Sequence, residues 1–333
     1  MERYFLGNNT AYGFKGYYED ELKNKSKVIL LKGGPGTGKS SILKKLAAEA
    51  KKRGYDCELW YCSGDPQSLD GVFIKDTGVA IVDATAPHAS GADLPKIKDY
   101  IFDLATSLSH DKLTPERERI EKLLNDKKRC FIRAYQHLKV ALCHLHNQLE
   151  LEMADLKQTN IRAYASVVAS NLRCTAKSAE RKLFTQAICP VGESVYYDHL
   201  RDKRIFKVDG GLASRKIFFD ELKGLIDGAT LILDPLEPEI VDGIIVGDAA
   251  VVSDVGHFAN GVSESINLYV YENSPETAAI EEEKNSVTTH IALAEDCLEN
   301  ARRNHLGAEK YFIEAMDFDR NGKIYADIVK EIF

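Results

Sequence analysis

The residues with the clearest chemical potential form a glycine-rich segment near the N-terminus. Residues 33–40 read Gly-Gly-Pro-Gly-Thr-Gly-Lys-Ser and match G-x-x-x-x-G-K-[ST] at every fixed position. The glycines allow backbone N–H groups to approach phosphate oxygens closely. Lys39 can reach the β- and γ-phosphates, and the Ser40 hydroxyl can hold Mg²⁺. The segment therefore predicts a site for MgATP that is formed by Gly33, Gly34, Pro35, Gly36, Thr37, Gly38, Lys39, Ser40 and Ser41.

A second chemical candidate is an acid at the end of an apolar run, Val-Ala-Ile-Val-Asp at residues 79–83. In phosphate-loop enzymes such an acid lies beside the loop and supports Mg²⁺. We therefore predict Lys39 and Asp83 as catalytic residues and Ser40 and Asp83 as the metal site. An ordinary aspartate at a strand end is the alternative for Asp83.

Three further residues lie at predicted strand ends on the ligand side, and we treat them as accessory candidates. They are Asp65, Asp70 and His88. One of them could position water or a phosphoryl acceptor, while His88 could equally be a buried, hydrogen-bonded residue. No glutamate follows Asp83, so a fast motor ATPase is disfavoured. Gly34 stands where one subgroup has a loop lysine that reaches across a dimer, so that subgroup is disfavoured too.

These residues need a strand, a helix and a parallel sheet to position them. Residues 28–31 are an apolar run typical of a buried strand, and Ile42, Leu43, Leu46 and Ala47 follow helical spacing. Further strands at 58–62 and 79–83 predict a largely parallel sheet, with ligands at the carboxyl ends of its strands. The predicted fold is α/β: tandem P-loop NTPase-type, three-layer αβα units with mostly parallel sheets and helical, coiled-coil-like insertions.

The chain also repeats itself at offsets of about 170–180 residues. Matching segments recur in the same order: 13–18 with 192–197, 65–71 with 237–243, and 80–82 with 250–252. In this register the glycine-rich segment meets residues 210–216, where Ser214 replaces the last glycine. Lys39 aligns with Arg215, or with Lys216 after a one-residue slip, and Asp83 aligns with Ser253. We therefore expect the second copy to have lost Mg-nucleotide binding.

Two units follow from this repeat. Residues 1–180 are predicted to form the intact unit, with a helical insertion at about 97–175, and residues 181–333 the degenerate unit with a C-terminal helical segment. Apolar residues from Phe131 to Leu156 step by three or four over about four heptads. We expect a pseudo-dimer of the two repeats within the chain, with further oligomerisation possible through the helical insertions.

Composition limits the partners. The chain has 333 residues, 44% hydrophobic and 29% charged, and a net charge of −7, so it carries no clear nucleic-acid footprint. No apolar run approaches the roughly 18 residues of a membrane helix, so we expect no membrane partner. Seven cysteines without a Cys-x-x-Cys pair favour free thiols and a cytoplasmic location.

Two other sequence patterns could indicate a ligand site. The first has two interpretations, and the second is incomplete. The basic run at 127–129 is typical of a solvated helix face, or could act as a lid that contacts phosphate. Residues 317–322 open like an EF-hand calcium loop, but position twelve is Ile328 instead of a bidentate glutamate. We therefore expect Asn321 and Gly322 to form a turn and not a calcium site.

The chain resembles a bacterial family of tandem phosphate-loop ATPases, described as ATP-binding or nucleotide-kinase-like. The similarity spans nearly the whole sequence and is carried by the following residues: Gly7-Asn8, Gly13-Phe14, Lys32 to Ser41, Asp65, Asp70-Gly71, Asp83 to His88 and Glu309 to Phe318. Members often carry a second intact loop, and this sequence departs from them at Ser214 and Arg215. The resemblance implies nucleotide binding at the first loop.

Three functions are compatible with these residues. The first is an ATP-binding P-loop NTPase with slow, Mg²⁺-dependent hydrolysis at one site in the N-terminal repeat. The second is a small-molecule or nucleotide kinase. ATP turnover that stays unchanged across a panel of metabolites would count against this function. The third is a non-catalytic, ATP-dependent regulatory or scaffold protein, in which the degenerate half is a docking surface.

Overall fold

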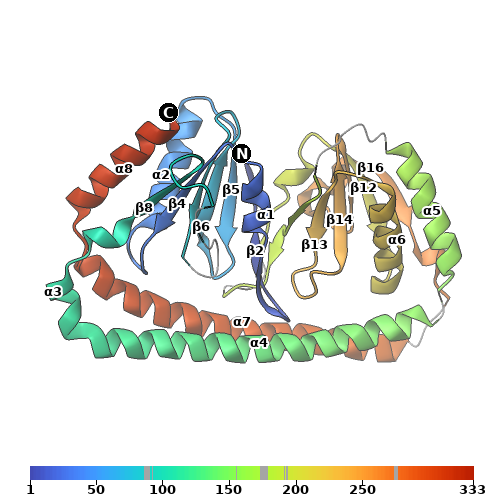
Figure 1. The fold of residues 1–333 in the computed structure, drawn as a ribbon. Coiled ribbons are helices and arrows are strands. Elements are labelled where there is room, and N and C mark those ends of the chain that lie inside the picture. The colour runs from blue at the N-terminus through green and yellow to red at the C-terminus, as the bar shows by residue number, and fades with distance from the viewer. Residues whose placement is uncertain are drawn as a thin grey trace.

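The chain folds into two six-stranded sheets with helices layered on them and two long helices beneath both (Figure 1). The computed structural model describes residues 1–85, 91, 93–154, 156–172, 179–190, 192, 194–273 and 277–333. The fold is α/β with mixed, mostly parallel sheets, as predicted.

The first sheet has the strand order β1-β5-β6-β7-β4-β8. Strand β6 is antiparallel to β5 and β7, whereas the pairs β1–β5, β7–β4 and β4–β8 are parallel. The strand bounds are β1 (Glu2–Tyr4), β4 (Lys27–Lys32), β5 (Cys57–Cys62), β6 (Asp65–Ile74), β7 (Val79–Asp83) and β8 (Asp99–Asp103). Strand β8 lies within the range that we predicted to be a helical insertion, so the sheet extends further along the chain than the sequence indicated.

The second sheet has the same topology. Starting from β9, its order is β9-β13-β14-β15-β12-β16, and only β14 is antiparallel to its neighbours. Its bounds are β9 (Arg181–Leu183), β12 (Arg204–Asp209), β13 (Thr230–Leu233), β14 (Val241–Val246), β15 (Ala249–Val252) and β16 (Val262–Asn267). A short hairpin follows the first strand in both halves: β2 (Gly7–Thr10) with β3 (Gly13–Gly16), and β10 (Gln186–Ala187) with β11 (Ser194–Val195). Both halves of the chain therefore build the same sheet.

Alternation along the strands divides each sheet into two faces. Ile29 and Leu31 of β4 pack against helix α2 (Lys39–Lys52), while Val28 and Leu30 belong to a cluster that includes Ile205 of the second sheet. Helix α1 (Tyr18–Lys23) joins this shared cluster, and helix α6 (Leu212–Leu225) packs on the other face of the second sheet. The two units thus share buried apolar side chains.

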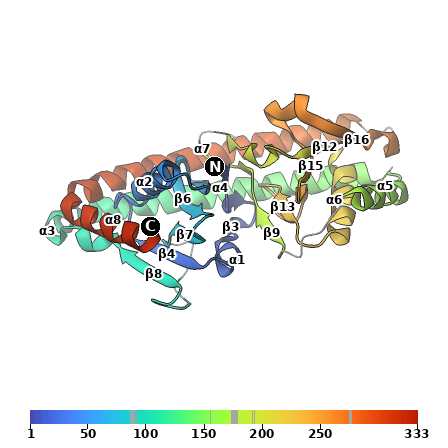
Figure 2. The ribbon, with the colours of Figure 1, turned by 90° about the horizontal axis from the view of Figure 1, so that it is seen from above.

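The long helices α4 (Arg117–Met153) and α7 (Thr277–Glu314) lie side by side beneath both sheets (Figures 1 and 2). They run in opposite directions, because His144 of α4 contacts Glu283 while the earlier Lys127 contacts the later His305. Their seam buries small and branched residues, among them Ala134, Leu138, Ala141, Ala294 and Leu298. The apolar faces that the sequence indicated are thus covered within the chain.

The helices that follow this pair are exchanged between the units. Helix α5 (Gln158–Asn171), from the first half of the chain, packs in the core of the second sheet. Helix α8 (Phe318–Ile332), from the second half, buries Ile328 and Ile332 against α2 and the first sheet. The boundary predicted near residue 180 therefore separates the strands but does not separate these helices. A short helix α3 (His110–Leu113) precedes α4.

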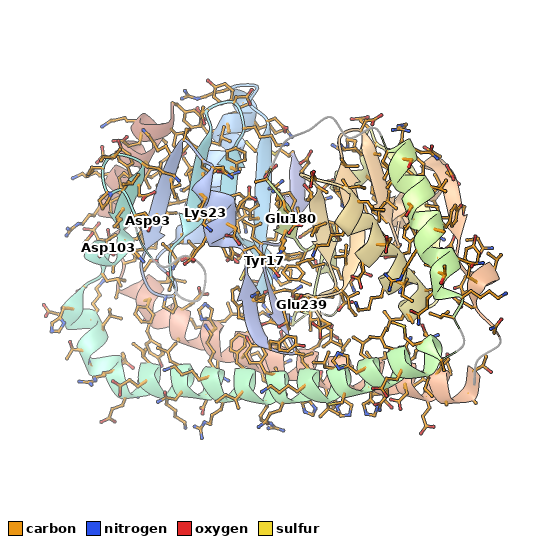
Figure 3. The ribbon with its side chains drawn as sticks, turned by 45° about the vertical axis from the view of Figure 1, so that its right-hand side comes forward. Tyr17, Lys23, Asp93, Asp103, Glu180 and Glu239 are labelled. Atoms are coloured by element: carbon orange, nitrogen blue, oxygen red, sulfur yellow. The ribbon has the colours of Figure 1, made fainter. Side chains whose placement is uncertain are left out.

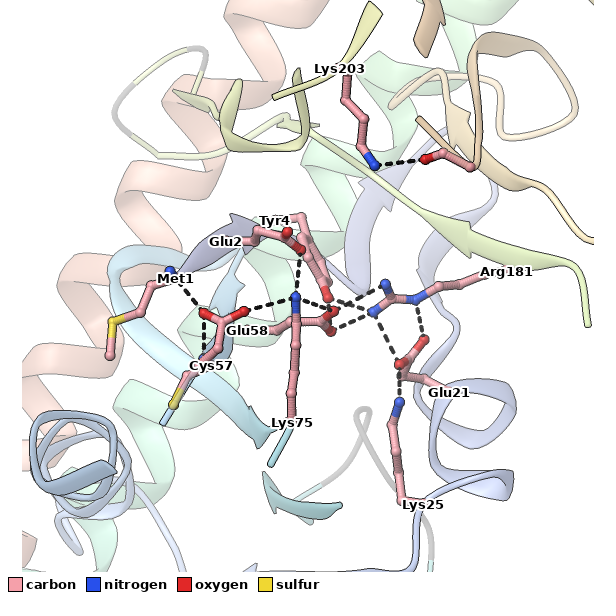
Figure 4. A network of polar contacts seen from close by, with 12 residues as sticks. Met1, Glu2, Tyr4, Glu21, Lys25, Cys57, Glu58, Lys75, Arg181 and Lys203 are labelled. Carbon is pink, nitrogen blue, oxygen red and sulfur yellow. Dashed lines mark hydrogen bonds and ion pairs between the residues drawn. The ribbon is translucent and has the colours of Figure 1, made fainter. Parts of the chain in front are cut away.

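A buried ionic cluster joins the units where β1 and β9 meet (Figure 4). The Arg181 guanidinium of β9 bonds Glu21 at 2.7 Å and Glu58 at 2.6 Å, and it also contacts the Tyr4 hydroxyl. Burial alone would raise the pKa of Glu21, but Arg181 and Lys25 lower it below its ordinary value. Nearby, Tyr17 lies at the junction close to Glu239 (Figure 3). These contacts fix one unit against the other.

Among the described residues, no helix has the length and apolar character needed to span a bilayer. The six cysteines in the described part of the chain are free thiols.

Candidate functional site

The predicted site lies at the carboxyl ends of two adjacent parallel strands. Strand β4 leads into residues 33–38, which we call the glycine loop, and α2 begins directly after it at Lys39. Strand β7 pairs with β4 so that Asp83 stands opposite Leu31. This register brings the Asp83 carboxylate to 3.7 Å from the Lys39 ammonium. The structure thus places the two residues that the sequence predicted as catalytic next to each other.

The glycine loop has a backbone that other residues rarely adopt. Gly36 and Gly38 have φ angles of +67° and +85°, in the left-handed region that favours glycine. A Cβ atom on Gly36 would also lie 2.8 Å from the carbonyl oxygen of Glu309. Both glycines are therefore required by the loop conformation and by what packs against it. Helix α2 has no side-chain hydrogen bond at its N-cap, Gly38, so no capping side chain offsets the partial positive charge of this helix end.

Internal hydrogen bonds hold the catalytic candidates in place. The Lys39 ammonium donates to the carbonyl oxygens of Gly33 at 3.0 Å and Gly34 at 2.8 Å. Thr85 donates from its hydroxyl to Gly33 at 2.9 Å and from its amide to Asp83 at 2.8 Å. Thr85 is a site residue that we did not predict, although its place two residues after the strand-end acid is a usable signal.

The other loop residues have distinct environments. The Ser40 hydroxyl oxygen accepts a hydrogen bond from the Leu69 amide at 3.1 Å and lies in the first turn of α2. Thr37 is buried and donates to the Gly34 carbonyl at 2.9 Å, so its side chain shapes the loop. Ser41 is exposed on the helix surface. Ser40 and Asp83 offer oxygen atoms of the kind that Mg²⁺ prefers.

The three accessory candidates differ. Asp70 is buried and accepts a hydrogen bond from the Tyr18 hydroxyl at 2.9 Å; burial, and then the charge of Asp70, raise the pKa of Tyr18 and Cys62. Asp70 is therefore a core residue. Asp65 is half-buried at the start of β6 and accepts from the Ser68 hydroxyl at 2.6 Å. His88 lies outside the described residues.

The glycine loop is roofed by residues from the far end of the chain. A Glu309 carboxylate oxygen accepts a hydrogen bond from the Gly36 amide at 3.1 Å, and the Asn321 side chain donates to the Thr37 carbonyl at 3.2 Å. Phe312 lies over Gly34. The turn predicted at Asn321 is wrong, because this residue lies inside α8, which Asp317 caps by accepting from the Arg320 amide at 3.0 Å.

The second unit has no comparable loop. Lys39 is seven residues beyond the end of β4 at Lys32, and Lys216 is seven residues beyond the end of β12 at Asp209, so these two lysines correspond. The alignment of Lys39 with Arg215 is therefore off by one residue. Helix α6 starts at Leu212, four residues before Lys216, whereas α2 starts at Lys39 itself. Residues 213 and 215, which correspond to Gly36 and Gly38 in this alignment, therefore lie inside helix α6.

Two glutamates cover the start of α6. Glu152 accepts a hydrogen bond from the Ala213 amide at 2.8 Å. Glu272 accepts from the Gly211 amide at 2.7 Å and from the Ser214 hydroxyl at 2.5 Å. Lys216 bonds Asp220 at 2.6 Å on the surface of α6. The anion position of the second unit is thus filled by carboxylates of the chain itself, through three hydrogen bonds.

The second unit does contain a small polar cavity of about 40 Å³ at the ends of β13 and β15. Asp242, His199 and Ser253 are among the side chains that line it. Burial, and then the charge of Asp242, raise the pKa of the neighbouring Asp234 to about 7. Burial also raises the pKa of Asp242. These two carboxyl groups therefore hold a proton at a pH where free aspartate is ionised.

Replacing Asp234 by asparagine should flatten the stability profile on the acid side of about pH 7, where the proton that folded Asp234 retains makes stability fall as pH rises. The folded pKa lies above the unfolded value, so the stabilisation from Asp234 is complete at low pH and is lost as pH rises through about 7. The asparagine side-chain oxygen can still accept hydrogen bonds from the Leu236 and Glu237 amides, but asparagine does not ionise. Urea denaturation between pH 5.5 and 8.5 measures this. The exposed Asp248→Asn variant should follow the wild type; parallel profiles for Asp234→Asn would contradict the assignment.

Comparisons with protein-family models, with curated proteins and with solved structures found nothing that matches this chain. The geometry of the glycine loop and of the residues around it is therefore the evidence that bears on function.

Proposed function

We propose that this chain is a P-loop NTPase that binds one MgATP at the glycine loop and hydrolyses it slowly, in the manner of the tandem phosphate-loop ATPases that it resembles. One observation carries the proposal: left-handed glycines lead from a buried strand into a helix, with Lys39 and Asp83 only 3.7 Å apart beside them. We further propose that both units belong to the P-loop class, and that the second unit has a structural role and does not bind nucleotide.

The residues of the site would have different roles in binding and hydrolysis. The amides of the loop and the positive end of α2 would bind the phosphates, and Lys39 would leave its two carbonyl acceptors to neutralise phosphate charge. Ser40 and Asp83 would hold Mg²⁺, which supplies charge neutralisation between the β- and γ-phosphates. In hydrolysis a water oxygen bonds to the γ-phosphorus, the bond to the β-bridging oxygen breaks, and ADP, phosphate and a proton are released.

The hydrolysis is expected to be slow. The Asp83 carboxylate already lies beside the Lys39 ammonium and accepts a hydrogen bond from the Thr85 amide. It is therefore a poor base for the attacking water. A glutamate directly after Asp83 is missing from the sequence. Phosphate release with ATP, measured with Mg²⁺ and again with excess chelator, tests the proposal. Turnover that is absent under both conditions would leave only nucleotide binding.

A second candidate, an ATP-dependent regulatory protein, is favoured by one contact. The glycine loop is held by Glu309 of α7, and α7 runs beneath both units. A phosphate oxygen and the Glu309 carboxylate would compete for the same Gly36 amide. ATP binding would therefore release α7 from the loop and transmit the change along the helix pair.

Glu309→Gln should strengthen ATP binding by about fivefold. Glutamine can still accept from the Gly36 amide, but that hydrogen bond loses about 1 kcal/mol without the charge, and the repulsion of phosphate disappears. Calorimetric titration of the full chain with MgATP measures the change. Glu314→Gln, exposed on the same helix, is the matched control. Weaker binding in Glu309→Gln would show that Glu309 supports the nucleotide site instead of competing with it.

A further inference from the structure

A lysine from the long helix α4 faces the same region as the glycine loop. Lys127 is half-buried, and its ammonium donates to the Nδ1 atom of His305 on α7 at 2.9 Å. In the part of the chain that the structure describes, no carboxylate lies within ion-pair distance of it. A half-buried ammonium without a counterion is costly, and such groups are typical of binding sites for anions.

A short series of contacts connects Lys127 to the loop. The Nε2 atom of His305 lies 3.6 Å from the same Glu309 oxygen that accepts the Gly36 amide. Lys127 is therefore one imidazole ring away from a carboxylate that occupies an anion position of the loop. His305 and Glu309 are one helical turn apart, so they lie on the same side of α7.

The charges around this group favour a bound anion. Burial, and also the positive charge of Lys39, lower the pKa of Lys127, although Glu309 opposes the shift. Burial, together with Lys127 and Lys39, lowers the pKa of His305 to about 4, so its imidazole is neutral and accepts from Lys127. Lys39 and Lys127, from different elements, are thus close enough for their charges to act on each other. Glu309 is the carboxylate that acts on Lys127, and Asp83 is the carboxylate that lies 3.7 Å from Lys39.

We propose that Lys127 is a second phosphate-binding lysine, which His305 holds beside the glycine loop and which pairs with the terminal phosphate of a bound nucleoside triphosphate. The inference rests on the proposed function. Its neighbours do not share this role, because Lys128 is exposed and Arg129 is paired with Asp126 at 2.6 Å. Of the basic run that the sequence left open, only Lys127 is thus placed as a phosphate contact.

The test compares Lys127→Met with Lys128→Met in the full chain. Methionine keeps the apolar length of lysine and removes the charge. We expect Lys127→Met to bind MgATP about 20-fold more weakly, with a smaller loss for MgADP, because one charge-assisted contact to the terminal phosphate is removed. Lys128→Met should match the wild type. The melting temperature of Lys127→Met without nucleotide should be equal to or above that of the wild type, since an unpaired charge has gone.

The outcomes separate the two proposals. If the wild type does not bind MgATP, the proposed function fails. If the wild type binds and Lys127→Met binds equally well, Lys127 is not a phosphate ligand. If Lys127→Met melts earlier and loses ATP and ADP affinity to the same extent, its role is structural and the inference is overturned. Lys127→Arg, which keeps the charge, should recover most of the difference between ATP and ADP.

Discussion

Lys39→Ala is expected to weaken MgATP binding by about 100-fold and to abolish phosphate release. The substitution removes the ammonium that lies 3.7 Å from Asp83 and bonds the two loop carbonyls. A charge-assisted bond to phosphate is worth about 2–3 kcal/mol, which corresponds to this loss of affinity. Titration of each variant with a fluorescent ATP analogue, in the presence of Mg²⁺, measures the affinity.

The second unit supplies the matched controls for this prediction. Lys216→Ala and Arg215→Ala should each retain wild-type affinity, because Lys216 is bonded to Asp220 and the start of α6 is covered by Glu152 and Glu272. Equal losses from Lys39→Ala and Lys216→Ala would show that both units bind nucleotide.

Arg181→Met is expected to lower the free energy of unfolding by about 3 kcal/mol. The guanidinium lies between the carboxylates of Glu21 and Glu58, which are both buried (Figure 4). Without it, the cations that remain near these two charges among the described residues are Lys25, at 2.6 Å from Glu21, and Lys75, at 3.6 Å from Glu58. Uncompensated buried charge is strongly destabilising, whereas the lost attraction in a solvated pair is small. Urea denaturation at pH 7 measures the change.

Arg204→Met provides the control for this stability prediction. Arg204 pairs with Asp248 at 2.8 Å on the exposed side of the second unit, so its loss should cost far less stability than the loss of Arg181. Equal costs for Arg181→Met and Arg204→Met would mean that the cluster between the units does not depend on its central guanidinium.

The sequence predicted the parts of the site that are local along the chain. Glycines at 33, 36 and 38 followed by Lys39 carry their own structural requirement, since their positive φ angles are needed in this loop. Asp83 could be placed because an apolar run that ends in an acid predicts a strand end beside the loop. In the second copy, the replacement of the last loop glycine, which the sequence assigned to Ser214, likewise led us to expect that Mg-nucleotide binding had been lost.

The residues that roof the loop could not be predicted in the same way. Glu309 and Asn321 are more than 270 residues from the loop in sequence, and Lys127 is about 90 residues away. Their approach depends on the antiparallel pairing of α4 and α7 and on the exchange of the helices that follow. Periodicity predicts an apolar face on each helix but not which helix covers it.

The central claim is that the chain binds nucleotide at one of its two related units. Calorimetric titration of the full wild-type chain with MgATP tests it most directly, because the stoichiometry counts the sites. We predict one MgATP per chain, bound about 100-fold more weakly by Lys39→Ala. Two equivalents per chain, or no heat of binding under conditions where the protein is folded, would contradict the account.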